Sequence, residues 1–245
     1  MRATRSVRAS AGEQGGIRLF LSALFVVVLA AGYLTYRWFS HEGVRTPLVL
    51  AYLRNPSAHK EWTVQAGAHC KEAPFILPTN GFIGYLWDDS FRPGHRHQGL
   101  DIFGGTGVDQ TPVLVAYSGY LTRLESWKSS IIIRIPEDPL HPSRQIWTYY
   151  THMASQNGDS FISARFPPGT FDVPVQAGDL LGYQGNYSGD PNNPVGVHLH
   201  FSIVLDDGKG GFRNELEIRN TLDPSPYLGL PVNARENRGE IPICN

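Results

Sequence analysis

The stretch Gly196-Val197-His198-Leu199-His200-Phe201 is a short apolar run that carries two histidines spaced two apart. Alternate residues of a β-strand point to the same face, so this pattern predicts a strand with His198 and His200 on one side. The apolar residues around them would then pack on the other side. Two imidazoles on one face suit a metal ion, but an isolated pair is equally compatible with ordinary core or surface histidines. The choice depends on whether other segments supply a third ligand and a carboxylate.

A second segment upstream, Arg96-His97-Gln98-Gly99-Leu100-Asp101-Ile102, places a histidine and an aspartate four apart around a glycine. In an extended chain such residues share a face, and Gly99 lets the backbone bend, so His97 and Asp101 can hold one ion. One histidine of the downstream pair would complete a set of two nitrogen ligands and one oxygen ligand. Three protein ligands plus water are typical of catalytic zinc, whereas structural zinc usually has four ligands and is rich in cysteine.

A third segment ends an aromatic, strand-like run with His152. Alone, His152 would be interpreted as a hydrogen-bonded core or surface residue, but the other two segments favour a place in the same site. His95 shares a face with His97, and we interpret it as a second-shell neighbour because only His97 has the glycine and aspartate at matching spacing. The other histidines lie outside any ligand spacing and are expected to face solvent: His41, His59, His69 and His141.

Three motifs in this order resemble the lysostaphin-type zinc endopeptidases, also called LytM-like: His-x-Gly-x-Asp at 97–101, Tyr-x-His at 150–152 and His-Leu-His-Phe at 198–201. The resemblance covers about residues 74–205, and it is specific in combination although each motif alone is weak. It implies an antiparallel β-sheet with a groove, a bound Zn²⁺, and hydrolysis of peptide bonds in peptidoglycan.

Carried over by position, the resemblance implies that His97, Asp101 and His200 are the zinc ligands. His152 and His198 would be the two active-site histidines that do not bind the metal, and the sequence leaves open which of them is the base. Tyr150, in the Tyr-x-His motif, is a candidate second-shell residue. No His-Glu-x-x-His pattern occurs, so a glutamate base of the thermolysin kind is excluded.

The chain departs from the family pattern just before the histidine pair. The family usually has Ser or Thr before the glycine, whereas here the approach over 189–197 is longer and lacks that hydroxyl, and Ser202 stands where an acidic residue is common. We expect these changes to affect cross-link preference more than metal binding. The alternative function is a non-catalytic LytM-like module that binds the wall or activates a hydrolase. Such modules typically lack several of the five site residues, and their retention here favours the enzyme.

The N-terminal segment contains a run without charges at 19–34, preceded by several arginines. This pattern predicts a transmembrane anchor or a signal sequence over 17–39, with 1–16 as a cytoplasmic tail and the rest of the chain outside. Cleavage after Ala30 is the competing interpretation. The predicted location is therefore the cell membrane, single-pass with the catalytic domain outside the cytoplasm, or secreted if the signal is cleaved.

The remaining sequence divides into a linker or entry arm at 40–73, a mostly antiparallel β domain at 74–228 and a polar tail at 229–245 that is expected to run over the surface. The arm has helical character at 48–53. Glycine and proline, 26 and 18 residues, indicate a turn-rich β protein. Expected strands lie at 99–103, 112–117, 119–125, 130–135, 146–152, 180–185 and 197–205.

Charge and cysteine content limit the remaining function classes. Lys plus Arg number 21 against 22 Asp plus Glu, and no basic block lies outside the N-terminus, so nucleic-acid binding is poorly supported. The two cysteines, Cys70 and Cys244, are too far apart in sequence for a zinc ribbon or a redox motif. They would form a disulfide if the chain is exported, and two free thiols otherwise. The oligomeric state does not follow from the sequence.

Overall fold

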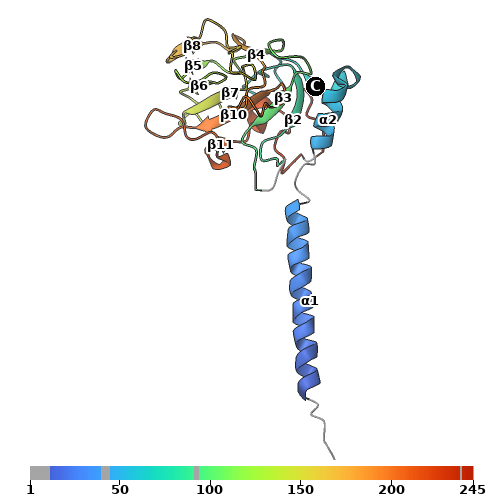
Figure 1. Ribbon diagram of the computed structural model, residues 1–245. Helices are drawn as coiled ribbons and strands as arrows, with labels where there is room; N and C mark the ends of the chain where they lie inside the picture. The colour runs from blue at the N-terminus through green and yellow to red at the C-terminus, as the bar shows by residue number, and fades with distance from the viewer. Residues whose placement is uncertain (1–11, 40–44, 91–93, 238, 245) are drawn as a thin grey trace, which may run out of the picture. The chain divides into compact units, whose positions relative to one another are not determined.

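The computed structural model describes residues 12–39, 45–90, 94–237 and 239–244 (Figure 1). The chain divides into two compact units, 1–42 and 43–245. The first unit contains helix α1 (Gly12–Phe39). No helix among the described residues combines the length and the apolar character needed to cross a membrane, so the structure does not support the transmembrane anchor that was one of the two predictions for 17–39. The expected tail up to residue 11 and His41 lie outside the described residues.

The second unit is built on an antiparallel sheet with the strand order β1-β2-β3-β10-β7-β6-β5-β8, and β11 pairs with β10. A smaller sheet pairs β4 with β9. All pairings between these named strands are antiparallel, which confirms the predicted fold class. The strands are β1 (Thr63–Val64), β2 (Gly81–Tyr85), β3 (Leu100–Phe103), β4 (Pro112–Leu114), β5 (Gly119–Thr122), β6 (Ile131–Ile135), β7 (Ile146–Thr151), β8 (Val173–Val175), β9 (Leu180–Tyr183), β10 (Leu199–Leu205) and β11 (Thr221–Leu222).

Strand β10 has the alternation that its sequence predicts. Leu199, Phe201 and Ile203 are fully buried and belong to the main hydrophobic core, together with residues of β2, β3, β6 and β7. His200 lies between them and therefore faces the opposite side of the sheet. The apolar face of the central strand is thus anchored in the core, and this anchoring holds the polar face in a fixed position.

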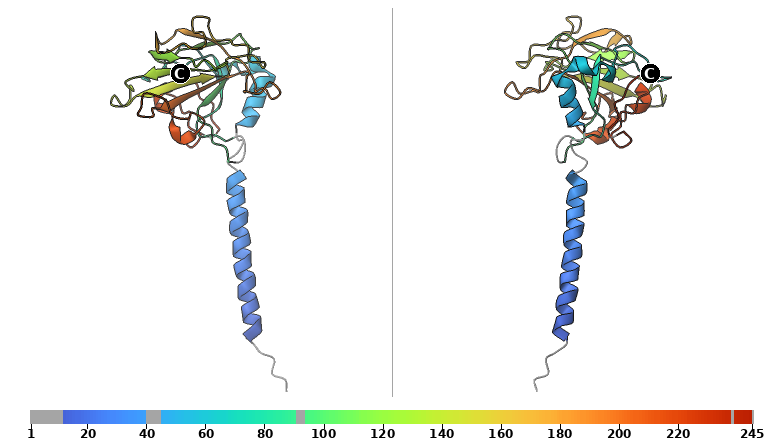
Figure 2. Two further views of the ribbon diagram at one scale, coloured as in Figure 1. Left: turned by 60° about the vertical axis from the view of Figure 1, so that its left-hand side comes forward. Right: turned by 90° about the vertical axis from the view of Figure 1, so that its right-hand side faces the viewer.

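Residues 45–64, predicted as part of a linker, instead pack against the domain. Helix α2 (Thr46–Arg54) lies beside β2 (Figures 1 and 2), and its Val49 and Tyr52 form a second cluster with Phe82 and Phe103. The 3-10 helix η1 (Pro56–Trp62) follows and leads into β1. Only two residues of α2 are buried, Val49 and Tyr52. Such a short apolar pattern is too weak for sequence periodicity to predict this packing.

The C-terminal tail is also more buried than its polar composition predicts. It follows η2 (Ile218–Asn220), β11 and the short helix α3 (Ser225–Leu228), and Asn233 and Asn237 are only 7% and 4% exposed. Their amides are satisfied internally: Asn233 Nδ2 donates to Asp223 at 2.6 Å and Asn237 Nδ2 to the Pro231 carbonyl at 2.8 Å. Near its end the tail is joined to residue 70 by the disulfide Cys70–Cys244, with Cα atoms 5.2 Å apart.

Candidate metal centre

Strand register brings two of the predicted ligands together. In the pairing of β10 with β3, His200 lies opposite Asp101, and in the pairing of β10 with β7 it lies opposite Thr151. Residues directly opposite each other in antiparallel strands project their side chains to the same face. His200 Nδ1 and Asp101 Oδ1 accordingly lie 2.9 Å apart.

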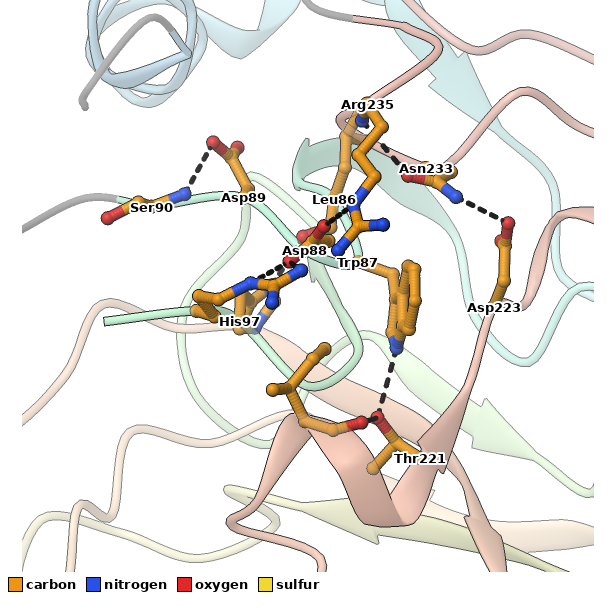
Figure 3. A network of polar contacts seen from close by, with 12 residues as sticks. Leu86, Trp87, Asp88, Asp89, Ser90, His97, Thr221, Asp223, Asn233 and Arg235 are labelled. Atoms are coloured by element: carbon orange, nitrogen blue, oxygen red, sulfur yellow. Dashed lines mark hydrogen bonds and ion pairs between the residues drawn. The ribbon is translucent and has the colours of Figure 1, made fainter. Parts of the chain in front are cut away.

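The loop that follows β2 positions the third predicted ligand, His97 (Figure 3). The His97 backbone N–H donates to the Asp89 carbonyl, and the Asp88 N–H donates to the His97 carbonyl, both at 2.8 Å. The imidazole Nδ1–H donates to the Leu86 carbonyl at 2.9 Å. Because this bond occupies Nδ1, the lone pair of Nε2 is left for a cation, which is the usual second-shell arrangement of a metal-binding histidine.

Residues from the C-terminal part of the domain also contact this loop. Trp87 Nε1 donates to Thr221 Oγ1 at 3.0 Å, and Arg235 and Arg96 both form ion pairs with Asp88 (Figure 3). The Trp87 N–H donates to the Val232 carbonyl at 3.0 Å. The position of His97 therefore depends on contacts more than a hundred residues away in sequence.

Gly99 is required by a close approach of two backbones rather than by a turn. A Cβ at this position would lie 2.2 Å from the Phe201 carbonyl oxygen of β10. Only a residue without a side chain lets the segment pass this close. Gly99 therefore permits the predicted bend between His97 and Asp101, and it also lets this segment pass close to β10.

The three donor atoms form a nearly regular triangle. His97 Nε2 lies 3.0 Å from Asp101 Oδ1 and 3.1 Å from His200 Nδ1, which completes the 2.9 Å edge between His200 and Asp101. The centre of a triangle with sides of about 3 Å is about 1.7 Å from each corner, so a point about 2.0–2.2 Å from all three atoms lies just outside its plane. These are zinc bond lengths, and the residues present fit the ion.

The electrostatics of the triangle also suit a cation. Burial alone would raise the pKa of Asp101, but the neighbouring His97 and His198 hold that pKa well below its usual range, so the carboxylate stays ionised. Burial lowers the pKa of His200, which favours the neutral, metal-binding form. Burial would also lower the pKa of His97, but the Asp101 carboxylate raises it overall, so a proton competes with the cation there.

His152 and His198 lie beside the triangle with their ring centroids 4.5 Å apart. Each imidazole uses Nδ1 to donate to a carbonyl: His198 to Gly196 at 2.6 Å and His152 to Tyr187 at 2.7 Å. Nε2 of both rings is therefore available for proton transfer. His198 Nε2 is 3.5 Å from the Asp101 carboxylate, and its ring stacks on Phe103.

His152 has two properties that set it apart. Its backbone is left-handed, with φ of 70°, directly after the last residue of β7, a conformation that non-glycine residues adopt rarely and that recurs at functional sites. Burial, and next the positive charge of His198, lower the pKa of His152 to about 3. The imidazole of His152 is consequently neutral at physiological pH, with the lone pair of Nε2 free.

A groove of about 480 Å³ opens over these histidines. Its floor contains a row of hydroxyls that the sequence did not reveal: Ser130 Oγ lies 2.7 Å from Thr151 Oγ1 and 3.0 Å from the hydroxyl of Tyr149. The alternation of β7 could have predicted part of this row, because it puts residues 149 and 151 on the same face of the sheet as His200. The walls come from three loops and include Trp127, Lys128, Tyr187, Ser188, Gly189, Glu215 and Leu216.

The remaining predicted residues lie in different environments, and not all match the predictions. His95 lines the groove, with its ring 6.3 Å from that of His97, as expected of a neighbour. The prediction for Tyr150 is wrong: strand alternation turns it into the core, where its hydroxyl accepts from the Ala116 N–H at 2.9 Å and its ring contacts Phe201. His69 and His141 are exposed, whereas His59 is partly buried and stacks on Trp62.

Comparison with known proteins gives similarity at the level of solved structures. Lysostaphin from Staphylococcus simulans is 18% identical over 67% of this chain and 55% of that chain, with a TM-score of 0.37. A putative glycyl-glycine endopeptidase lytM from Ruminococcus gnavus is 28% identical over 53% of this chain and 45% of that chain, with a TM-score of 0.34. The chain thus spans about half the length of each.

A third similar structure is the catalytic domain of the prophage-encoded protein EnpA from Enterococcus faecalis, which is 20% identical over 60% of this chain and 94% of that domain, with a TM-score of 0.36. No protein-family model and no curated protein sequence matches the chain. The structures found are of the lysostaphin and LytM types that the three sequence motifs resemble.

Proposed function

We propose that this chain is an exported zinc-dependent endopeptidase that hydrolyses peptide bonds in bacterial peptidoglycan. The observation that carries the proposal is the meeting of His97 Nε2, Asp101 Oδ1 and His200 Nδ1 within 3.1 Å of one another, beside two further histidines in one groove. The disulfide supports export, because such bonds persist in oxidising compartments. The resemblance of the motifs to lysostaphin-type enzymes supplies the substrate class.

The donor set favours zinc over Ca²⁺ and Mg²⁺. Two imidazole nitrogens and one carboxylate oxygen suit Zn²⁺, whereas Ca²⁺ and Mg²⁺ prefer sites made entirely of oxygen. Three protein ligands leave one coordination position for water or substrate. When bound, the zinc ion polarises the scissile carbonyl and lowers the pKa of water towards about 7.

The two histidines that lie outside the triangle divide the proton chemistry. His152, which is neutral and has Nε2 unprotonated, would accept the proton of the attacking water at Nε2 and pass it to the nitrogen of the leaving amine when the C–N bond breaks. His198, with Nε2 3.5 Å from the Asp101 carboxylate, is held where it can donate a hydrogen bond to the developing oxyanion when protonated. The carbonyls of Tyr187 and Gly196 keep both rings oriented through Nδ1.

A non-catalytic wall-binding or hydrolase-activating module is the alternative function. A module that only binds has no need of two histidines placed for proton transfer, and their convergence here favours the enzyme. The two functions differ in whether wall peptides are cut or only bound.

The test is a digest of purified peptidoglycan by residues 43–245, the compact unit that contains the site, with the full chain run in parallel. We expect soluble fragments with new amino termini, their loss with a chelator, and their recovery when zinc is added back. Binding of peptidoglycan without release of fragments, in zinc-loaded protein, would instead support the module.

A further inference from the structure

The groove contains two opposite charges that are not paired with each other. Lys128 and Glu215 both line it, from separate loops. Neither takes part in an ion pair with any residue in the described portion of the chain. Charged side chains that face a groove without a counter-charge are available to a ligand.

Lys128 belongs to the wall beside the proposed base. Its Nζ lies 5.7 Å from the centre of the Tyr187 ring, a cation–π contact. The carbonyl of Tyr187 accepts the bond from His152 Nδ1. Lys128 thus contacts the residue that orients His152.

Glu215 belongs to a different wall. The next residue, Leu216, accepts a hydrogen bond at its carbonyl from Gln98 Nε2 at 2.8 Å, and Gln98 directly follows the metal ligand His97. Glu215 and Tyr149 both line the groove, so a cationic group bound by Glu215 would lie in the same groove as the hydroxyls of β7.

Apart from the donor triangle, the groove is also lined by the uncharged hydroxyl residues Ser130, Tyr149 and Thr151, whose hydroxyls bond to one another at 2.7–3.0 Å. The groove therefore presents a cation, a neutral polar floor and an anion. This pattern complements an extended ligand that carries one free carboxylate and one free ammonium group.

We propose that Lys128 and Glu215 are the specificity-determining residues of this groove, and that they select peptides carrying both a free carboxylate and a free amine. Lys128 binds the carboxylate and Glu215 binds the ammonium. The proposal rests on the endopeptidase function above and names the substrate class of the same site. Cross-linked peptidoglycan peptides in which both groups are uncapped would be preferred over capped ones.

The experiment uses soluble cross-linked peptides isolated from peptidoglycan, chosen to carry both groups, in three forms: untreated, with carboxylates converted to amides, and with amines acetylated. Hydrolysis of each is measured for the wild type, Lys128→Gln and Glu215→Gln. The matched controls are Lys60→Gln and Glu61→Gln, two exposed charges on η1 that do not line the groove.

For the wild type we expect amidation and acetylation each to raise KM about 5-fold, the size of one exposed ion pair, with kcat little changed. Lys128→Gln should have a KM about 5-fold above that of the wild type on untreated peptide. Amidation should not raise the KM of this variant further, whereas acetylation should. For Glu215→Gln, acetylation should not raise the KM further, whereas amidation should. The control variants should behave as the wild type.

Two outcomes would overturn the assignment while leaving the endopeptidase function intact: wild-type protein that cuts all three forms equally well, or Lys128→Gln and Glu215→Gln variants that still discriminate as the wild type does. An equal change in the control variants would also overturn it. Failure of the zinc-loaded wild type to cut any form is a different result, because it would contradict the proposed function itself.

Discussion

At the scale of single residues, His198, just before β10, and His200, within it, show how two identical side chains two residues apart are placed for different roles. The Nδ1 of His200 points to the donor triangle, 2.9 Å from Asp101, whereas the Nδ1 of His198 is used by the Gly196 carbonyl. The difference arises from neighbouring atoms rather than from the side chain itself. Their substitutions should therefore have different effects.

His152→Ala and His198→Ala should each retain about one zinc ion per chain and lose peptidoglycan hydrolysis by about 100-fold or more, because each removes a proton-transfer group and leaves the three donor atoms in place. His97→Ala should lose the zinc as well. Metal content and rate of fragment release are the two measurements. The exposed His141→Ala is the control. Near wild-type turnover in either His152→Ala or His198→Ala would rule out its assigned role.

The sequence predicts the pairs within each segment because their geometry is local, whereas the meeting of His97 and Asp101 with His200 spans about a hundred residues. Alternation places His198 and His200 together, and a spacing of four places His97 beside Asp101. The prediction for Tyr150 is wrong because the even-numbered residues of β7 face the core, as its pairing with Phe201 shows, whereas the resemblance to the family carries no information on the face. The hydroxyl row at Ser130 was missed because it joins two strands across the sheet, which sequence spacing does not encode.

At the scale of elements, the site depends on how closely the segment before β3 crosses β10. Gly99 is the contact point, where a Cβ would meet the Phe201 carbonyl at 2.2 Å. The opposing atoms are backbone, so neither side can give way without moving a strand. The Cβ of an alanine at Gly196, only four residues from the proposed metal ligand His200, would by contrast approach nothing closer than a Phe103 ring carbon at 3.7 Å.

Gly99→Ala should accordingly lower the free energy of unfolding by about 1–3 kcal/mol and weaken zinc binding, since β3 and β10 carry two of the three ligands. Gly196→Ala should change both quantities little. Thermal unfolding and zinc titration of the two variants provide the measurement. Equal stability and zinc affinity in both would show that the close crossing does not control the site.

At the scale of the whole domain, hydrogen bonds and a disulfide join the first part of the second unit to its C-terminal tail. Buried Arg45, just before α2, donates to the carbonyls of Gly84 and Ile83 at 2.5 and 2.8 Å and to that of Glu240 in the tail at 2.8 Å. The Cys70–Cys244 disulfide makes a second link, over a sequence separation of 174. Such long-range links could not be deduced from local pattern, which explains why the arm and tail were predicted to lie outside the core.

The double substitution Cys70→Ser/Cys244→Ser should lower the free energy of unfolding by about 2–5 kcal/mol, because the bond restricts the unfolded chain. Zinc binding should remain, since neither cysteine lines the groove. Thermal unfolding of the variant and of the reduced wild type should give matching midpoints. A variant as stable as the oxidised wild type would show that the bond contributes nothing to the domain.

The central claim, that three side chains hold one zinc ion beside two free histidines, is tested most directly by anomalous X-ray scattering at the zinc edge from crystals grown with zinc. The account predicts a single peak about 2.0–2.2 Å from His97 Nε2, Asp101 Oδ1 and His200 Nδ1, with His152 and His198 outside bonding distance. A peak bonded to His152 or His198, or zinc-soaked crystals without a peak at the triangle, would contradict it.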